Sequence, residues 1–98
     1  MNIITQYVVQ KVAGQRQKVG VLVGGIIDHT QTVKFGWSRA NVHKDKFNRH
    51  YGLKLAESRM KATAPVPVPD SMYETALNFR MRCIRYFKHA TAVQEIIV

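Results

Sequence analysis

The sequence predicts one α+β domain (residues 1–98), in which a three-stranded antiparallel β-meander precedes two α-helices. Three observations lead to this prediction. β-Branched and aromatic residues fill the first 37 positions, two later segments repeat apolar residues at helical spacing, and alternating prolines separate those segments. A chain of 98 residues can bury one core but is too short for two.

The sheet is predicted within residues 1–37. Residues 3–12 are rich in isoleucine, valine and tyrosine, and they end at a polar turn over residues 13–17. The second strand covers residues 18–27 and is interrupted by Gly20 and by the pair Gly24-Gly25, where we expect a bulge or a sharp bend. A third short strand covers residues 32–37 and completes the meander.

The first helix is predicted over residues 42–62, with Asn41 or Asp45 as its cap. Gly52 interrupts it and indicates a close approach of another backbone. The residues expected to face the sheet recur at spacings of four and three, with two alanines at the margin of the stripe: Phe47, Tyr51, Leu55, Ser58, Ala56 and Ala62.

A stiff connector, residues 63–70, follows, because prolines at alternate positions force extended backbone. A spacer is favoured over a groove-binding proline motif. Ser71 and Glu74 match a capping box that begins a second helix over residues 71–90. The tail, residues 91–98, is a candidate edge strand.

The second helix carries an unusually wide apolar surface. One row contains Tyr73, Leu77, Met81, Ile84 and Lys88, the adjacent row contains Ala76, Phe79, Cys83 and Phe87, and the opposite stripe contains Asn78, Arg82, Arg85 and His89. We therefore expect the sheet on one flank and another helix or subunit on the other, which predicts a homo-oligomer. The single cysteine, Cys83, is interpreted as a small buried hydrophobe and excludes an intrachain disulfide.

The net charge is +9 and the pI is near 10.1, which favours a polyanionic partner. The chain contains no apolar run of membrane-spanning length and no dedicated lysine face for a membrane surface. The first twelve residues do not resemble a secretory signal, so we expect the protein to stay in the cytosol where it is made.

The charge is densest between Lys34 and Lys61, where eight basic residues oppose Asp45 and Glu57. Four aromatics are interleaved, Phe35, Trp37, Phe47 and Tyr51, and they offer surfaces on which unpaired bases can stack. This mixture favours RNA. The alternative, that the aromatics fill the core and the charges form a solvated helix face, stays open.

No catalytic or metal-binding constellation is present in the sequence. The histidines, His29, His43, His50 and His89, lack metal-ligand spacing on a shared helix face, and the six acids are scattered. We therefore predict a protein that is not an enzyme and has no cofactor. A ribonuclease that uses His43 or His50 beside basic neighbours is the enzymatic alternative.

One segment resembles a family of small basic proteins from tailed bacteriophages. The resemblance rests on Gly36-Trp37-Ser38, Asn41, Lys44-Asp45-Lys46-Phe47-Asn48, Gly52, Ala56 and Arg59, about a quarter of the chain. One branch of that family, from T-even-type phages, binds RNA and inhibits the host ToxN endoribonuclease, the toxin of a type III toxin–antitoxin system. The resemblance implies counter-defence against such a toxin and no catalytic residues.

The leading hypothesis is thus a non-enzymatic phage RNA-binding protein. Its candidate contacts are Lys34, Trp37, Arg39, Lys44, Lys46, Arg49, Lys54, Arg59, Lys61, Arg82 and Arg85. The rivals are a direct protein inhibitor that docks on an acidic patch of a host enzyme and, third, a DNA-binding protein, although no helix-turn-helix pattern is present.

Overall fold

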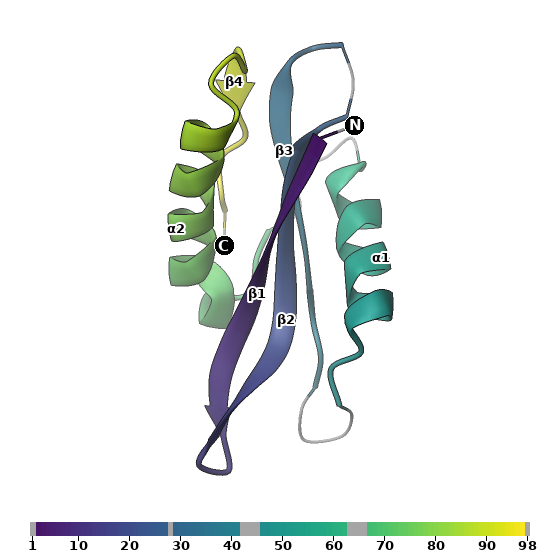
Figure 1. Ribbon diagram of the computed structural model, residues 1–98, viewed down its shortest axis with the longest axis vertical. Coiled ribbons are helices and arrows are strands. Elements are labelled where there is room, and N and C mark those ends of the chain that lie inside the picture. The colour runs from purple at the N-terminus through teal and green to yellow at the C-terminus, as the bar shows by residue number, and fades with distance from the viewer. Residues whose placement is uncertain (1, 28, 42–45, 63–66, 98) are drawn as a thin grey trace.

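A computed structural model describes residues 2–27, 29–41, 46–62 and 67–97. It confirms the predicted class. The strands β1 (Asn2–Val12), β2 (Gln15–Ile26) and β3 (Thr32–Arg39) form an antiparallel meander, which α1 (Arg49–Met60) and α2 (Asp70–Tyr86) follow. The short strand β4 (Ala92–Val93) then pairs in parallel with β3, so the sheet order is β1-β2-β3-β4. Figure 1 shows the two helices on either side of the sheet.

Each face of the sheet has its own core. On one face, Leu22 and Phe35 pack with Met72, Phe79 and other residues of α2. On the other face, two valines of β2, Val21 and Val23, pack with Ala56 and Met60 of α1. Because side chains alternate along a strand, β2 supplies residues to both cores and is buried on both sides.

The β1–β2 turn is tighter than the sequence predicted. Ala13 and Gly14 form it alone, with φ of 52° and 82°, as a two-residue hairpin turn of the primed type requires. The residues expected in the turn, 15–17, belong to β2.

A β-bulge lies where β1 and β2 change register. Val8 pairs with Gly20, but Val9 pairs with Lys18, which leaves Val19 as the extra residue of β2. The bulge or bend predicted at Gly24 and Gly25 is absent from the pairing of β2, whose register is continuous there with both neighbouring strands. Gly24 instead makes room for α2, because a Cβ at that position would lie 2.8 Å from Cys83 Sγ.

Helix α1 starts at Arg49, later than predicted, and Asn48 caps it in place of Asn41 or Asp45. Asn48 Oδ1 accepts a hydrogen bond from the Tyr51 amide at 3.0 Å, and the preceding Phe47 packs against Gly52. Of the predicted range, residues 46–48 are not helical, and residues 42–45 lie outside the described residues.

The buried stripe of α1 also differs from the prediction, since it consists of Gly52, Ala56 and Met60. Tyr51 is 66% exposed and Ser58 is exposed, although both were expected on the sheet. Two of the three buried residues, Gly52 and Ala56, are small, because the helix backbone lies directly on β3. A Cβ on Gly36 would overlap with the Ala56 carbonyl oxygen and lie 2.7 Å from the Met60 amide nitrogen.

Helix α2 begins one residue before the predicted start and ends at Tyr86 instead of near residue 90. The predicted capping box is wrong. Pro69 occupies the cap position with φ of −61° and makes no side-chain bond, while its carbonyl accepts from the Met72 amide at 2.9 Å. The buried row is Met72, Ala76, Phe79 and Cys83, so the sheet does cover one flank of the helix as predicted.

The C-terminal segment is an edge strand, as the sequence suggested, and it is tied to α2 and to the connector. Arg80 donates hydrogen bonds to the carbonyls of Val93 and Gln94, and the Val68 amide donates to the Ile97 carbonyl at 2.9 Å. Val68 is buried, so the described part of the connector contributes to the core; residues 63–66 lie outside the described residues. Among the described residues, no helix is long and apolar enough to cross a membrane.

Cys83 is buried in the core beneath α2, as predicted. Burial disfavours the thiolate and raises the pKa of the thiol from 9.0 to about 12, although the nearby charge of Arg82 acts in the opposite direction. This thiol is therefore protonated at neutral pH and packs as a small hydrophobe.

We expect Gly36→Ala to destabilise the fold by more than about 3 kcal/mol, because a backbone cannot yield to the added methyl group as a side chain can. Urea unfolding followed by circular dichroism measures the loss. The comparison variant is Gly14→Ala, which meets no atom within 4 Å. Its positive φ should cost only about 1–2 kcal/mol. Equal losses in the two variants would contradict the proposed backbone contact.

Candidate nucleic-acid interface

The β1–β2 hairpin carries basic side chains on one face only. Tyr7 packs into the core beneath α1, so Val9 and Lys11, which follow at intervals of two, lie on the α1 side of the sheet. Cross-strand partners share a face, and the partners of Val9 and Lys11 are Lys18 and Arg16. In agreement, Lys18 Nζ lies 4.5 Å from the centroid of the Tyr7 ring.

The opposite face of the same hairpin is polar and uncharged. It carries Gln10, which pairs with Gln17, and Val12, which pairs with Gln15 and packs on the α2 side. The positive charge of the hairpin is therefore directed toward the side that α1 covers.

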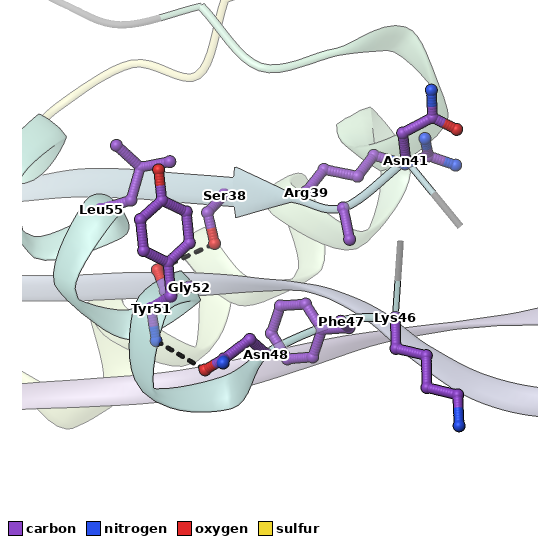
Figure 2. A pocket seen from close by; sticks show the side chains of 10 residues that line it. Ser38, Arg39, Asn41, Lys46, Phe47, Asn48, Tyr51, Gly52 and Leu55 are labelled. Carbon is purple, nitrogen blue, oxygen red and sulfur yellow. Dashed lines mark hydrogen bonds between the residues drawn. The ribbon is translucent and has the colours of Figure 1, made fainter. Parts of the chain in front are cut away.

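A groove of about 450 Å³ lies at the same end of the molecule, between the end of β3 and the first turn of α1. Figure 2 shows Arg39 and Asn41 on the β3 side of this groove and Asn48 and Tyr51 on the α1 side. Its volume falls within the range of small-ligand sites, about 300–1,000 Å³. The N-terminal end of α1 and the hairpin turn both point downward in Figure 1. The groove and the basic hairpin face thus belong to one surface.

The contacts around the groove hold its wall in place. The Ser38 hydroxyl is buried and donates to the Gly52 carbonyl at 2.8 Å, which joins β3 to α1. Arg39 Nη2 donates to Gln10 Oε1 at 2.8 Å, which joins the end of β3 to β1. The groove is therefore formed by fixed elements of the fold on both sides.

The first turn of α1 is electropositive. It contains no acidic residue, although acids are favoured at the positive end of the helix dipole. Arg49 occupies the first helical position instead, Lys46 precedes it, and both are exposed. Among the described residues, the one acid of α1 is Glu57, two turns further on.

We name this surface the α1-side basic face. It comprises Lys11, Arg16, Lys18, Lys46, Arg49 and Lys54, together with the groove and the exposed ring of Tyr51. Three of these six basic residues were candidate contacts in the sequence, namely Lys46, Arg49 and Lys54. Arg39, a fourth candidate, reaches the other side of the sheet, where its guanidinium binds Gln10.

Other predicted contacts are distributed elsewhere. Lys34 and Lys61 lie toward the C-terminal end of α1, where cations suit the negative end of the helix dipole. Lys44 lies outside the described residues. Arg82 and Arg85 are on α2, across the sheet from α1, and Arg82 donates to the Thr5 carbonyl and to Gln6 Oε1 at the outer edge of β1.

Trp37 and Arg59 contact each other. The guanidinium carbon of Arg59 lies 4.2 Å from the centroid of the Trp37 ring, and Arg59 Nη1 donates to the Trp37 carbonyl at 2.8 Å. The ring is half-buried against the α2-side core, and its Nε1 is buried with no hydrogen-bond partner in the described part of the chain. These two residues join α1 to the edge of β3, so Trp37 does not present an open ring for base stacking.

The sequence reasoning missed Lys11, Arg16 and Lys18. Their spacing around the hairpin carried part of the signal, because Lys11 and Arg16 pair directly across a two-residue turn at Ala13 and Gly14. The side of the sheet on which Arg16 and Lys18 lie could not be obtained by alternation from the buried residues of β2, since the bulge at Val19 reverses both residues.

No metal site is found where the structure describes the chain, since nowhere there do three or more His, Cys, Asp or Glu residues come together. His50 is exposed on α1 and does not line the groove, and His43 lies outside the described residues. The enzymatic alternative therefore gains no geometric support from the described histidines.

Comparison of the chain with protein-family models, with curated proteins and with solved structures found no match.

Proposed function

We propose that this protein is a non-enzymatic RNA-binding protein that holds single-stranded RNA on its α1-side basic face. The observation that supports the proposal best is the convergence of the basic hairpin face, the basic first turn of α1 and an exposed aromatic ring beside one groove. Each of these features has a counterpart in a single-stranded nucleic acid, namely the phosphates and the unpaired bases.

The placement of Arg49 supports a functional role for the charge. A cation at the positive end of a helix dipole costs about 0.3–1 kcal/mol, whereas Arg59 and Lys61 at the other end are favourable. A phosphate bound at the first turn would offset this cost, because amides at a helix N-terminus and basic side chains both attract anions. The unfavourable charge thus has an explanation in a bound polyanion.

Tyr51 supports a single-stranded ligand over duplex DNA. Its side chain is 66% exposed beside the groove and lies outside the buried stripe of α1, so the fold does not require an aromatic ring there. An exposed ring offers a stacking platform to an unpaired base, which a base-paired duplex cannot use. In addition, α1 lies flat on the sheet and α2 lies on the other face, so the two helices do not form a helix-turn-helix.

The resemblance to the tailed-phage family supplies the biological part of the proposal, which is counter-defence through inhibition of a ToxN endoribonuclease. This part is supported by the resemblance alone. In such a mechanism the bound RNA would bring the inhibitor and the RNA-cleaving toxin together, so RNA binding on the α1-side basic face would be necessary for inhibition.

We expect the triple variant Arg16→Gln, Lys46→Gln, Arg49→Gln to bind RNA at least about tenfold more weakly and to lower the salt slope of log K by about two, since three phosphate contacts are removed. Fluorescence anisotropy with a labelled oligouridylate measures both quantities. The single variant Lys46→Gln is measured as well, and its RNA affinity is compared with that of Lys88→Gln, which removes one charge beyond the end of α2. A triple variant with an unchanged slope would exclude this face as the RNA site.

Tyr51→Ala should weaken binding to the same oligonucleotide by about 1–3 kcal/mol, the usual contribution of one stacked base. Tyr51→Phe keeps the ring and should bind like the wild type. Because the side chain is exposed, neither substitution should lower the urea midpoint appreciably. Equal affinity of the alanine and phenylalanine variants would argue against stacking on this residue.

Co-expression with a ToxN endoribonuclease tests the counter-defence proposal. The wild type should relieve the growth arrest caused by the toxin, whereas the triple glutamine variant should fail at equal expression. If the triple variant has lost RNA binding and still protects, the rival interpretation of direct protein inhibition is favoured. If the wild type does not protect, counter-defence against this toxin is wrong, while RNA binding stands on its own measurement.

A further inference from the structure

The outer side of α2 exposes a row of large apolar residues. Leu77, Met81 and Ile84 are 40%, 51% and 38% exposed and recur at spacings of four and three, so they form one stripe along the helix. The sheet-facing row, Met72, Ala76, Phe79 and Cys83, is separate and fully used by the core. The single chain therefore leaves more than a third of each of these three side chains, Leu77, Met81 and Ile84, uncovered.

Charges of opposite sign flank the two ends of this stripe. Glu74 is exposed one turn before Leu77, and Arg85 is exposed directly after Ile84. Neither has an ion-pair partner in the described part of the chain, where the ion pair of α2 is Arg80 with Glu95. The exposed side of α2 is thus acidic toward its start and basic toward its end.

We propose that this stripe binds the same stripe of a second copy of the chain, in a two-fold dimer with antiparallel α2 helices. In this arrangement Leu77 faces Met81 of the second copy. Glu74 precedes Leu77 by three positions, so it faces Ile84 of the second copy, which follows Met81 by three positions. Glu74 then lies beside Arg85 of the second copy, and the two-fold axis repeats this pair.

The charge pattern favours a second copy of the chain as the partner and an antiparallel arrangement of the two α2 helices. A parallel arrangement would place Glu74 beside Glu74 and Arg85 beside Arg85, whereas the antiparallel one pairs opposite charges and opposes the two helix dipoles. An anionic membrane or RNA would complement only the basic end of the stripe and not the acid at its start. A surface that is apolar in the centre, acidic at one end and basic at the other is complementary to itself.

The dimer would place the α1-side basic faces on the outside, since α1 and α2 cover opposite faces of the sheet. Arg85, a candidate RNA contact by sequence, then becomes a dimer contact. Two outward basic faces would engage one RNA at two places, which raises the apparent affinity without new contacts. The dimer itself does not depend on the proposed RNA binding.

Sedimentation equilibrium of the full chain tests this inference, after nucleic acid is removed by nuclease and a high-salt wash, at protein concentrations on the order of 100 μM. Wild type should be dimeric. Glu74→Arg and Arg85→Glu should each raise the dimer dissociation constant at least about tenfold, because each places like charges together. The double variant Glu74→Arg, Arg85→Glu should restore the dimer, and an equimolar mixture of the two single variants should form a heterodimer.

Lys54→Glu is the matched control, because it makes the same charge change as Arg85→Glu on the exposed side of α1. It should leave the dimer unchanged, and circular dichroism should show that all variants remain folded. A monomeric wild type, or single variants that dimerise as well as the wild type, would overturn the proposal. A dimer lost in both single variants and not restored in the double variant would overturn the antiparallel pairing.

Discussion

The close packing of α1 on β3 is the constraint on which the rest of this structure depends. The absence of a side chain at Gly36 lets the helix backbone at Ala56 lie directly on the strand, and the Ser38 hydroxyl binds the Gly52 carbonyl one turn earlier along the helix. These contacts fix both the distance and the direction of α1. They therefore determine where the first turn of α1 lies. The position of that turn sets the positions of Lys46, Arg49 and Tyr51 around the groove.

A sheet covered by one helix on each face leaves two kinds of surface for function. On the α1 side the helix buries only one narrow row of residues. Polar or basic residues occupy the rest of its circumference, so that side carries the excess positive charge. On the α2 side the core row is bulky, and a second apolar row remains exposed between charges of both signs. The two faces thus suit two different partners, a polyanion and a second copy of the chain.

The order of strands and helices could be predicted, because alternation, helical periodicity and the prolines at 65, 67 and 69 are local signals. The start of α1 and its buried face could not. Three candidate caps lie within eight residues, and the choice of Asn48 depends on where Phe47 meets Gly52 in three dimensions. The basic hairpin face depends on the bulge at Val19, which turns Lys18 and Arg16 toward α1, and a bulge of this kind is fixed by pairing and not by either strand alone.

The segment on which the proposed resemblance to the tailed-phage family rests consists largely of residues that join α1 to the sheet. Gly36, Ser38, Asn48, Gly52, Ala56 and Arg59 make the strand contact, the buried hydrogen bond, the helix cap and the Trp37 contact. Such residues specify how a helix docks on a strand, so a shared motif of this kind implies a shared scaffold more strongly than a shared ligand. Of the proposed RNA contacts, Lys46 lies within that motif, whereas Arg16, Lys18, Arg49 and Tyr51 lie outside it. Proteins with the same scaffold are therefore free to differ in what they bind, and most of the residues that would select the ligand of this chain surround the motif.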